Sequence, residues 1–145
     1  DEDLAMCCLI DPDALPAIDR MCRRYPKTTV VIDHFSRIGE SGEIKPADVK
    51  ALTDLARHKN VYVKISAYYA LGKKKPPYHD LGPMIKQMLD AYGRKRLMWA
   101  SDAPFQVVDG HTYKASIDLI KSGLDFLDDD DREWLLRKTA ERVFF

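Results

Sequence analysis

The sequence predicts an α/β domain built on a parallel β-sheet, and two observations favour that class. Four short, continuous apolar runs recur along the 145 residues, at 4–10, 28–34, 61–66 and 96–101. Such runs are typical of strands that are buried on both faces, as in parallel sheets. A stretch with the apolar spacing of a helix follows each run, so the predicted order is βαβαβαβα with one further helix at the end.

Each expected helix carries a start or stop signal of its own. Pro46 suits the first turn of the second helix, whose apolar residues continue to position 56. The other helical stripes cover residues 15–22, 85–92 and 113–120, and the residues that close them are Pro26, Gly93 and Gly123. The run Asp130-Asp131-Arg132-Glu133 has the form of a capping box, so we expect the last helix to begin near Asp130.

Composition excludes several classes of protein. Hydrophobic residues make up 46% of the chain and charged residues 32%, which is typical of a globular domain. Lys plus Arg equals Asp plus Glu at 23 each, so the broad basic surface of a nucleic-acid binder is not expected, nor is attraction to an anionic membrane. The three cysteines, Cys7, Cys8 and Cys22, form neither a zinc pattern nor an even set. We therefore expect free, buried thiols and a reducing cytoplasmic location.

Polar side chains gather where three of the predicted strands end. His34 and Arg37 follow the second strand, Lys64 and Ser66 lie on the third, and Asp102 follows the fourth. In parallel α/β folds the carboxyl ends of the strands share one rim, where sites are found. A neutral imidazole and a carboxylate suit a divalent metal such as zinc or manganese. A carboxylate can also act as a general base toward water, and the cations would attract an anionic substrate.

Structural interpretations stand beside these. His34 and Asp102 could cap turns, Lys64 could pair with a carboxylate, and Ser66 could be only a small residue at a strand end. Asp33 has the opposite side-chain parity to His34, which favours a structural role. Three further histidines, His58, His79 and His111, are expected in surface roles. The polar loop 73–77 is either a solvated loop or a lid over the site.

Four segments in this order resemble the C-terminal half of the amidohydrolase-related family often called amidohydrolase 2. They are residues 30–34 (VVIDH), 60–66 (NVYVKIS), 96–104 (RLMWASDAP) and 139–144 (TAERVF). The resemblance implies a (β/α)8 TIM barrel of which residues 1–145 form the C-terminal half, about the last four βα units. It also implies a metal-dependent hydrolase, with pyrone-dicarboxylate lactonase-like enzymes and some decarboxylases among its relatives.

The resemblance implies a role for each matching position. His34 would end the sixth barrel strand, and Asp102 would end the eighth as a metal ligand or as the base that activates water. Arg37 would bind a substrate carboxylate, with Lys64 and Ser66 on the seventh strand near the site. Zinc or manganese would then be held by His34 and Asp102.

Two departures qualify these implications. The family's first-strand His-x-His pair is absent from this sequence, and the fifth strand offers Cys7 and Cys8 where some members have a histidine ligand. A half barrel also leaves open sheet edges and half of an apolar interior. With Asp1 as its first residue, we expect the chain to need a missing N-terminal half barrel or a second copy of itself, and activity only in the complete barrel.

Three functions remain open at this point. The first is hydrolysis of a lactone or a related carboxylate-bearing ester or amide by water attack. The second is a metal-dependent, non-oxidative decarboxylase on the same fold. The third is a non-catalytic half barrel that acts as an assembly module.

Overall fold

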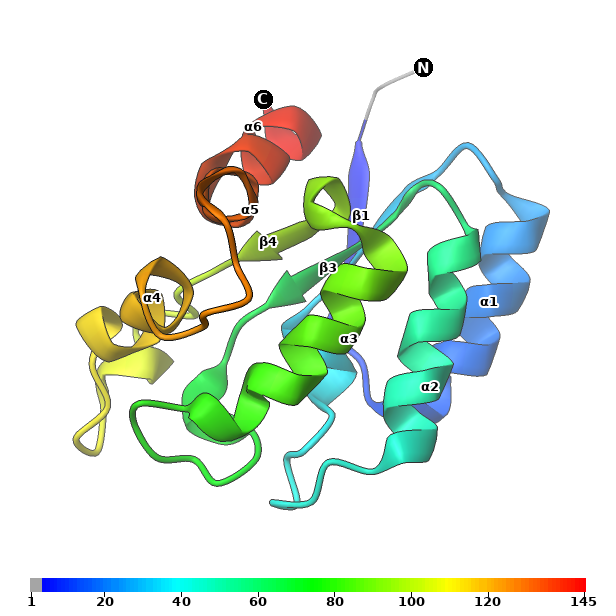
Figure 1. Ribbon diagram of the computed structural model, residues 1–145. Helices are drawn as coiled ribbons and strands as arrows, with labels where there is room; N and C mark the ends of the chain where they lie inside the picture. Colours follow the sequence, from blue (N-terminus) through cyan, green and yellow to red (C-terminus); the bar gives the residue numbers. More distant parts are fainter. Residues whose placement is uncertain (1–3) are drawn as a thin grey trace.

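The computed structural model describes residues 4–145 and confirms the parallel α/β order (Figure 1). Residues 1–3 of the expected domain lie outside the described part. Strands pair in parallel and in chain order, β1-β2-β3-β4, as four neighbouring units of a barrel would. The strands are shorter than the apolar runs that predicted them; they are β1 (Ala5–Cys8), β2 (Thr29–Ile32), β3 (Val61–Ile65) and β4 (Leu97–Trp99).

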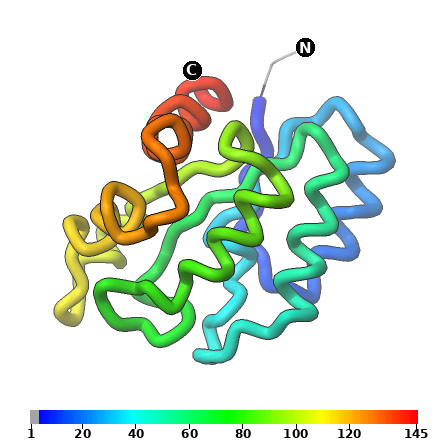
Figure 2. Tube along the Cα trace, viewed as in Figure 1, coloured from blue at the N-terminus to red at the C-terminus, as the bar shows by residue number. Residues whose placement is uncertain are grey.

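Three helices lie side by side on one face of the sheet, as the traces show (Figures 1 and 2). They are α1 (Leu15–Arg24), α2 (Pro46–Asp54) and α3 (Gly82–Tyr92), and α4 (Tyr113–Lys121) follows the fourth strand. Pro46 begins α2 and Gly93 ends α3, as the sequence predicts. Within residues 4–145, no helix has the length and apolar character that a membrane span requires.

Alternating side chains divide the sheet into two faces with different partners. Val30, Ile32 and Val63 belong to the large core between the sheet and the helices. Val31, Tyr62 and Met98 point the other way and form a smaller cluster, which Ala140 and Val143 cover. The first face is therefore a complete core, whereas the second is covered by only one helix end.

The last helix runs from Asp129 to Phe144 as three continuous parts. These are α5 (Asp129–Glu133), a π-helical turn (Trp134–Lys138) and α6 (Thr139–Phe144). The capping box lies two residues earlier than predicted: Asp128 Oδ1 accepts from the Asp131 backbone N–H at 2.6 Å, and Asp131 Oδ2 accepts from that of Asp128 at 3.2 Å. Our prediction of a box at Asp130–Glu133 was wrong because the helix begins at Asp129, which places Asp130 inside it, and Glu133 pairs with Lys138.

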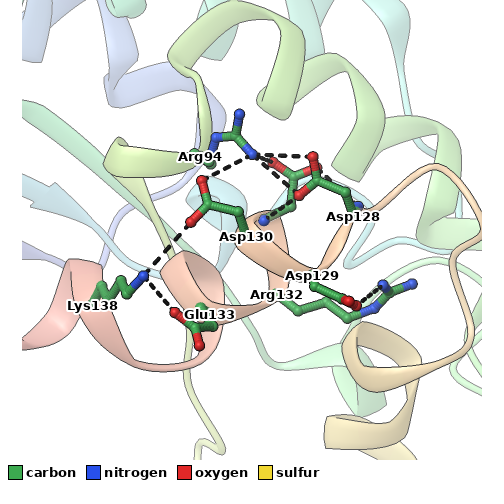
Figure 3. Close-up of polar contacts among 8 residues, drawn as sticks. Arg94, Asp128, Asp129, Asp130, Arg132, Glu133 and Lys138 are labelled. Atoms are coloured by element: carbon green, nitrogen blue, oxygen red, sulfur yellow. Dashed lines mark hydrogen bonds and ion pairs between the residues drawn. The ribbon is translucent and has the colours of Figure 1, made fainter.

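Arg94 anchors the start of this helix to the turn that precedes β4. Its Nη1 lies 3.1 Å from Asp128, 3.3 Å from Asp130 and 3.0 Å from Asp131 (Figure 3). Four successive aspartates begin at position 128, and they lie where the helix dipole favours negative charge. The acidic run therefore has a structural role: it begins the last helix, and Arg94 links it to the turn before β4.

The second face of the sheet explains one error in the sequence prediction. Cys7 was expected in the core, but it is exposed, because its side chain points to this incompletely covered face; Cys8 is partly buried and Cys22 is buried. All three thiols are free, as expected. Leu9 has the same parity as Cys7 and is 65% exposed. The uncovered face is what a half barrel leaves when the facing strands are absent.

An ion-pair cluster joins α1 to the end of α2 on the helical side of the sheet. Asp19 Oδ2 lies 2.7 Å from Arg23, and Asp19 Oδ1 lies 2.7 Å from His58 Nε2 and also contacts Arg57. The hydrogen bond with His58, and then those with Arg57 and Arg23, hold the pKa of Asp19 well below its ordinary value, although desolvation opposes them. His58 is thus a structural partner and not only a surface histidine.

We predict that Asp19→Asn makes the free energy of unfolding depend less on pH in the acidic range. The lowered folded-state pKa means that the carboxylate stabilises the fold above the unfolded value of about 3.9. That contribution is lost as the pH falls through the folded-state value. Urea unfolding of the intact protein should show Asp19→Asn less stable at about pH 7, with the difference shrinking below about pH 4. Asp90→Asn, which breaks only an exposed pair with Lys86, is the control, and an equal effect at both positions would contradict the prediction.

Candidate active site

The parallel register brings three strand ends to one rim of the sheet. Val31 pairs with Tyr62 and Lys64 pairs with Met98, so β2, β3 and β4 end at nearly the same level. His34, Tyr69 and Asp102 extend beyond these ends and line a cleft of about 480 Å³. The remaining lining residues are Leu9, Arg37, Glu40, Ala67, Ala70, Leu71 and Phe105. The cleft thus lies where sites of parallel α/β folds are found.

A left-handed turn carries the two polar residues that follow β2. His34, Phe35, Ser36 and Arg37 have φ angles of 52°, 51°, 55° and 57°. Each such residue costs about 1–2 kcal/mol, because the Cβ atom approaches the following carbonyl oxygen. Phe35 is fully buried, and Ser36 Oγ donates to the Ile10 carbonyl at 3.3 Å, which holds the turn in place. The turn buries its two central residues while His34 and Arg37 reach the cleft.

His34 is fixed between two partners. Its Nδ1 lies 2.7 Å from Ser66 Oγ, and its Nε2 lies 3.5 Å from Asp102 Oδ1. When Nδ1 carries the proton, it donates to Ser66 and the Nε2 lone pair faces the carboxylate. Ser66 is fully buried and does not line the cleft, and its hydroxyl contacts the His34 ring.

Tyr69 is a site residue that the sequence reasoning missed. Its hydroxyl donates to Asp102 Oδ2 at 2.9 Å. Burial, followed by the hydrogen bond and the charge of Asp102, raises the pKa of Tyr69 to about 12. The signal in the sequence was the pair Tyr68-Tyr69, which follows the third strand within a few residues. Asp102 therefore has one oxygen facing His34 and the other held by a phenol that keeps its proton.

Arg37 reaches the cleft with its charge already paired. Its Nη1 lies 3.1 Å from Asp11 Oδ1, and its Nη2 contacts the Glu40 carboxylate. Glu40 also lines the cleft, whereas Asp11 does not. The predicted anion-binding guanidinium thus has a carboxylate on each of its two terminal nitrogens.

Lys64 lies on the second face of the sheet and below the cleft. Its Nζ is 2.8 Å from Asp33 Oδ1 and 5.7 Å from the centre of the Phe144 ring. Lys64 is absent from the cleft lining, and both members of the pair are largely shielded from solvent. The geometry favours the structural interpretation of Lys64, with Asp33 as the carboxylate that compensates a half-buried ammonium group.

A polar cluster lies directly behind Tyr69. Tyr78 Oη lies 2.7 Å from His111 Nδ1, and Gln106 Nε2 donates to the same oxygen at 3.0 Å. The His111 ring meets Tyr69 edge-on, with ring centres 6.1 Å apart. His111 therefore supports a cleft residue, which the expected surface role did not include. All five residues of the loop 73–77 are exposed and none lines the cleft, as expected of a solvated loop.

His34 and Asp102 have the spacing of two ligands of one metal ion. Ligands about 2.0–2.2 Å from a tetrahedral zinc ion are separated by roughly 3.4 Å. The distance between His34 Nε2 and Asp102 Oδ1, 3.5 Å, fits that geometry. Across residues 4–145, no group of three or more His, Cys, Asp or Glu side chains could hold a metal. This chain can therefore supply two ligands, and a complete site needs others from outside it.

Comparison with known proteins gives one family and several relatives. The sequence profile of the amidohydrolase family matches residues 5–145. The chain is 34% identical over 109 residues to an L-fucono-1,5-lactonase from Burkholderia ambifaria, covering 75% of this chain and 38% of that protein. It is 27% identical over 132 residues to a 4-sulfomuconolactone hydrolase from Hydrogenophaga intermedia, covering 88% and 43%. The chain thus spans about two fifths of the length of these relatives.

Solved structures share the fold over nearly the whole chain. An amidohydrolase from Burkholderia multivorans with bound zinc superposes with a TM-score of 0.80 at 23% identity, covering 96% of this chain and 51% of that one. A 2,6-dihydroxybenzoate decarboxylase from Rhizobium superposes less closely, with a TM-score of 0.54 at 14% identity over 86% of this chain and 36% of that one. These matches confirm that the chain has the fold of about half an amidohydrolase TIM barrel.

We predict that Ser66→Ala weakens zinc binding by the intact protein about 10–100-fold, as loss of a residue that orients a metal-binding histidine typically does. Zinc affinity measured by competition with a chelator tests this without any assay of activity. Ser116→Ala is the matched control, because Ser116 is also fully buried but accepts from Trp99 away from the cleft. Equal zinc affinity in the Ser66→Ala variant and the wild type would contradict the prediction that Ser66 orients His34 for metal binding.

Proposed function

The chain belongs to the amidohydrolase family, and we propose that, within a complete barrel, it hydrolyses a lactone by attack of water on the ring carbonyl. The observation that carries this proposal is the pair formed by His34 Nε2 and Asp102 Oδ1, 3.5 Å apart at the rim of the cleft. Two relatives whose names denote hydrolysis of a lactone support it.

Asp102 is the proposed general base. A water molecule adds to the lactone carbonyl while its proton passes to the Asp102 carboxylate. The tetrahedral intermediate then collapses, the bond from the carbonyl carbon to the ring oxygen breaks, and the proton passes from Asp102 to the departing oxygen. The product is an open-chain hydroxy acid, and Asp102 returns to its ionised form.

His34 and Tyr69 position the Asp102 carboxylate for this proton transfer. Ser66 fixes the imidazole, and the Tyr69 phenol donates to Asp102 Oδ2, which leaves Oδ1 for the water. A divalent ion such as zinc or manganese, held by His34 and by ligands from outside this chain, would polarise the carbonyl and lower the pKa of water, while Asp102 Oδ1 stays available as the base. Arg37 is the cation that lines the cleft, and Lys64 stays paired with Asp33.

The barrel must be completed for this chemistry to occur. β1 and β4 are the edges of the sheet, and Leu9 and Cys7 are exposed on the face that would become the barrel interior. We propose that the missing units, or a second copy of the chain, cover this face. The free thiols favour the reducing cytoplasm as the place where this occurs.

Decarboxylation is the weaker candidate. A decarboxylase of the same fold superposes with a TM-score of 0.54, against 0.80 for the zinc-containing amidohydrolase. Decarboxylation would depend more on a metal ion and less on Arg37, and across residues 4–145 no cluster of three or more metal-binding side chains is found. The assembly-module hypothesis predicts no turnover at all. The activities of the wild type and of the Asp102→Asn variant therefore separate it from catalysis.

We predict that Asp102→Asn in the intact protein lowers kcat/KM for a lactone about 10²–10⁴-fold, because the amide cannot accept the proton of water. Release of acid from the lactone, followed with a pH indicator, measures the rate. Asp109→Asn is the control, since Asp109 is an exposed carboxylate seven residues further along that does not line the cleft. Full activity in Asp102→Asn would contradict the base assignment, and a wild-type protein without turnover would favour the assembly module.

Tyr69→Phe should lower kcat about tenfold to a hundredfold with little change in KM, because the variant loses the donor that orients Asp102. Since the pKa of Tyr69 is raised to about 12, the phenol keeps its proton through the working range. The pH profiles of kcat for the variant and the wild type should therefore have the same shape and differ only in the size of kcat. Tyr113→Phe, at an exposed tyrosine outside the cleft, is the control. A changed profile shape, or a loss confined to KM, would overturn this role.

A further inference from the structure

The charges around the cleft do not suit the anionic substrate that the sequence suggested. The cleft lining contains one guanidinium group, from Arg37, and two carboxylates, from Glu40 and Asp102. Asp11 adds a third carboxylate against Arg37 from outside the lining. The other cation of the rim, Lys64, is paired with Asp33 below the cleft. Among the side chains of this part of the rim, negative charges therefore outnumber positive ones before any bound metal ion is counted.

Arg37 also has its terminal nitrogens engaged. A guanidinium group binds a carboxylate best with two parallel N–H groups. Nη1 lies 3.1 Å from Asp11 and Nη2 contacts Glu40, so an incoming carboxylate would compete with these partners for the paired N–H groups of the guanidinium. Glu40 is only three residues along the chain from Arg37, and a tethered group competes at a high effective concentration. A displaced Glu40 would remain beside the incoming anion and repel it.

Building on the proposed lactone hydrolysis, we infer that Glu40 sets the charge selectivity of the site by occupying Arg37. The preferred substrate is then an uncharged lactone that carries hydroxyl groups, and a lactone with a carboxylate or sulfonate is disfavoured. An ionised carboxylate only accepts hydrogen bonds, so the free lone pairs of Glu40 suit hydroxyl donors. Leu9, Ala70 and Phe105 give the cleft an apolar wall for the carbon face of a ring.

A pair of lactones with the same ring tests this inference. D-Glucono-1,4-lactone is uncharged, and D-glucaro-1,4-lactone carries a carboxylate where the first has a hydroxymethyl group. Binding of both is measured by calorimetry on the intact protein in an Asp102→Asn background, which reads selectivity without turnover. The intact protein should bind the uncharged lactone at least about tenfold more tightly.

Glu40→Gln keeps the size of the side chain and removes its charge. This variant should reduce the preference at least about tenfold, by strengthening binding of the carboxylated lactone. Glu43→Gln makes the same change of net charge nearby at a residue that does not line the cleft, so it should leave the preference unchanged.

Each outcome decides one claim. A preference for the carboxylated lactone, no binding of either compound, or equal effects of Glu40→Gln and Glu43→Gln would overturn the selectivity role of Glu40. If the binding preference and its loss in Glu40→Gln are found but wild-type protein hydrolyses neither lactone, the selectivity stands and the proposed reaction is wrong.

Discussion

The parallel register of four strands is the constraint on which the rest of this structure depends. Because β2, β3 and β4 are parallel and end within about two residues of one another in register, residues 34, 69 and 102, far apart in the chain, meet across one cleft. The same register separates the two faces of the sheet. One face carries the large core under α1, α2 and α3, and the other is left for the remainder of a barrel. A slip of one residue would exchange these faces and move the polar side chains away from the rim.

Strain and charge pairing shape what the rim can do. Four successive left-handed residues after β2 place His34 and Arg37 on the cleft and Phe35 in the core, a conformation that persists only because the surroundings hold it. Ser66 and Tyr69 then orient the imidazole and the carboxylate. Each cation of the rim has a nearby carboxylate, so the remaining reactive groups are the Nε2 atom of His34 and Asp102. These groups suit activation of water more than capture of an anion.

The sequence was sufficient for the strand order, the helices and the position of His34 and Asp102, because strand periodicity and chain direction determine which residues reach the rim. It could not show that Arg37 pairs with Asp11 or that Lys64 pairs with Asp33. These partners are many residues apart in the sequence, and only the fold brings them together. Tyr69 was missed because a tyrosine after a strand is equally typical of core packing, which is the role of its neighbour Tyr68. Cys7 was misplaced because a buried strand was assumed to be covered on both faces.

We propose that water activated at the His34–Asp102 pair attacks the carbonyl carbon of a lactone. Hydrolysis by the intact protein in water enriched in oxygen-18 tests it most directly, with the spontaneous reaction subtracted. Each enzyme-dependent turnover should place one labelled oxygen in the carboxylate of the hydroxy acid and none in the newly formed hydroxyl group. Label in that hydroxyl group would mean attack at the alkyl carbon, and release of carbon dioxide would mean decarboxylation; either result would contradict the account.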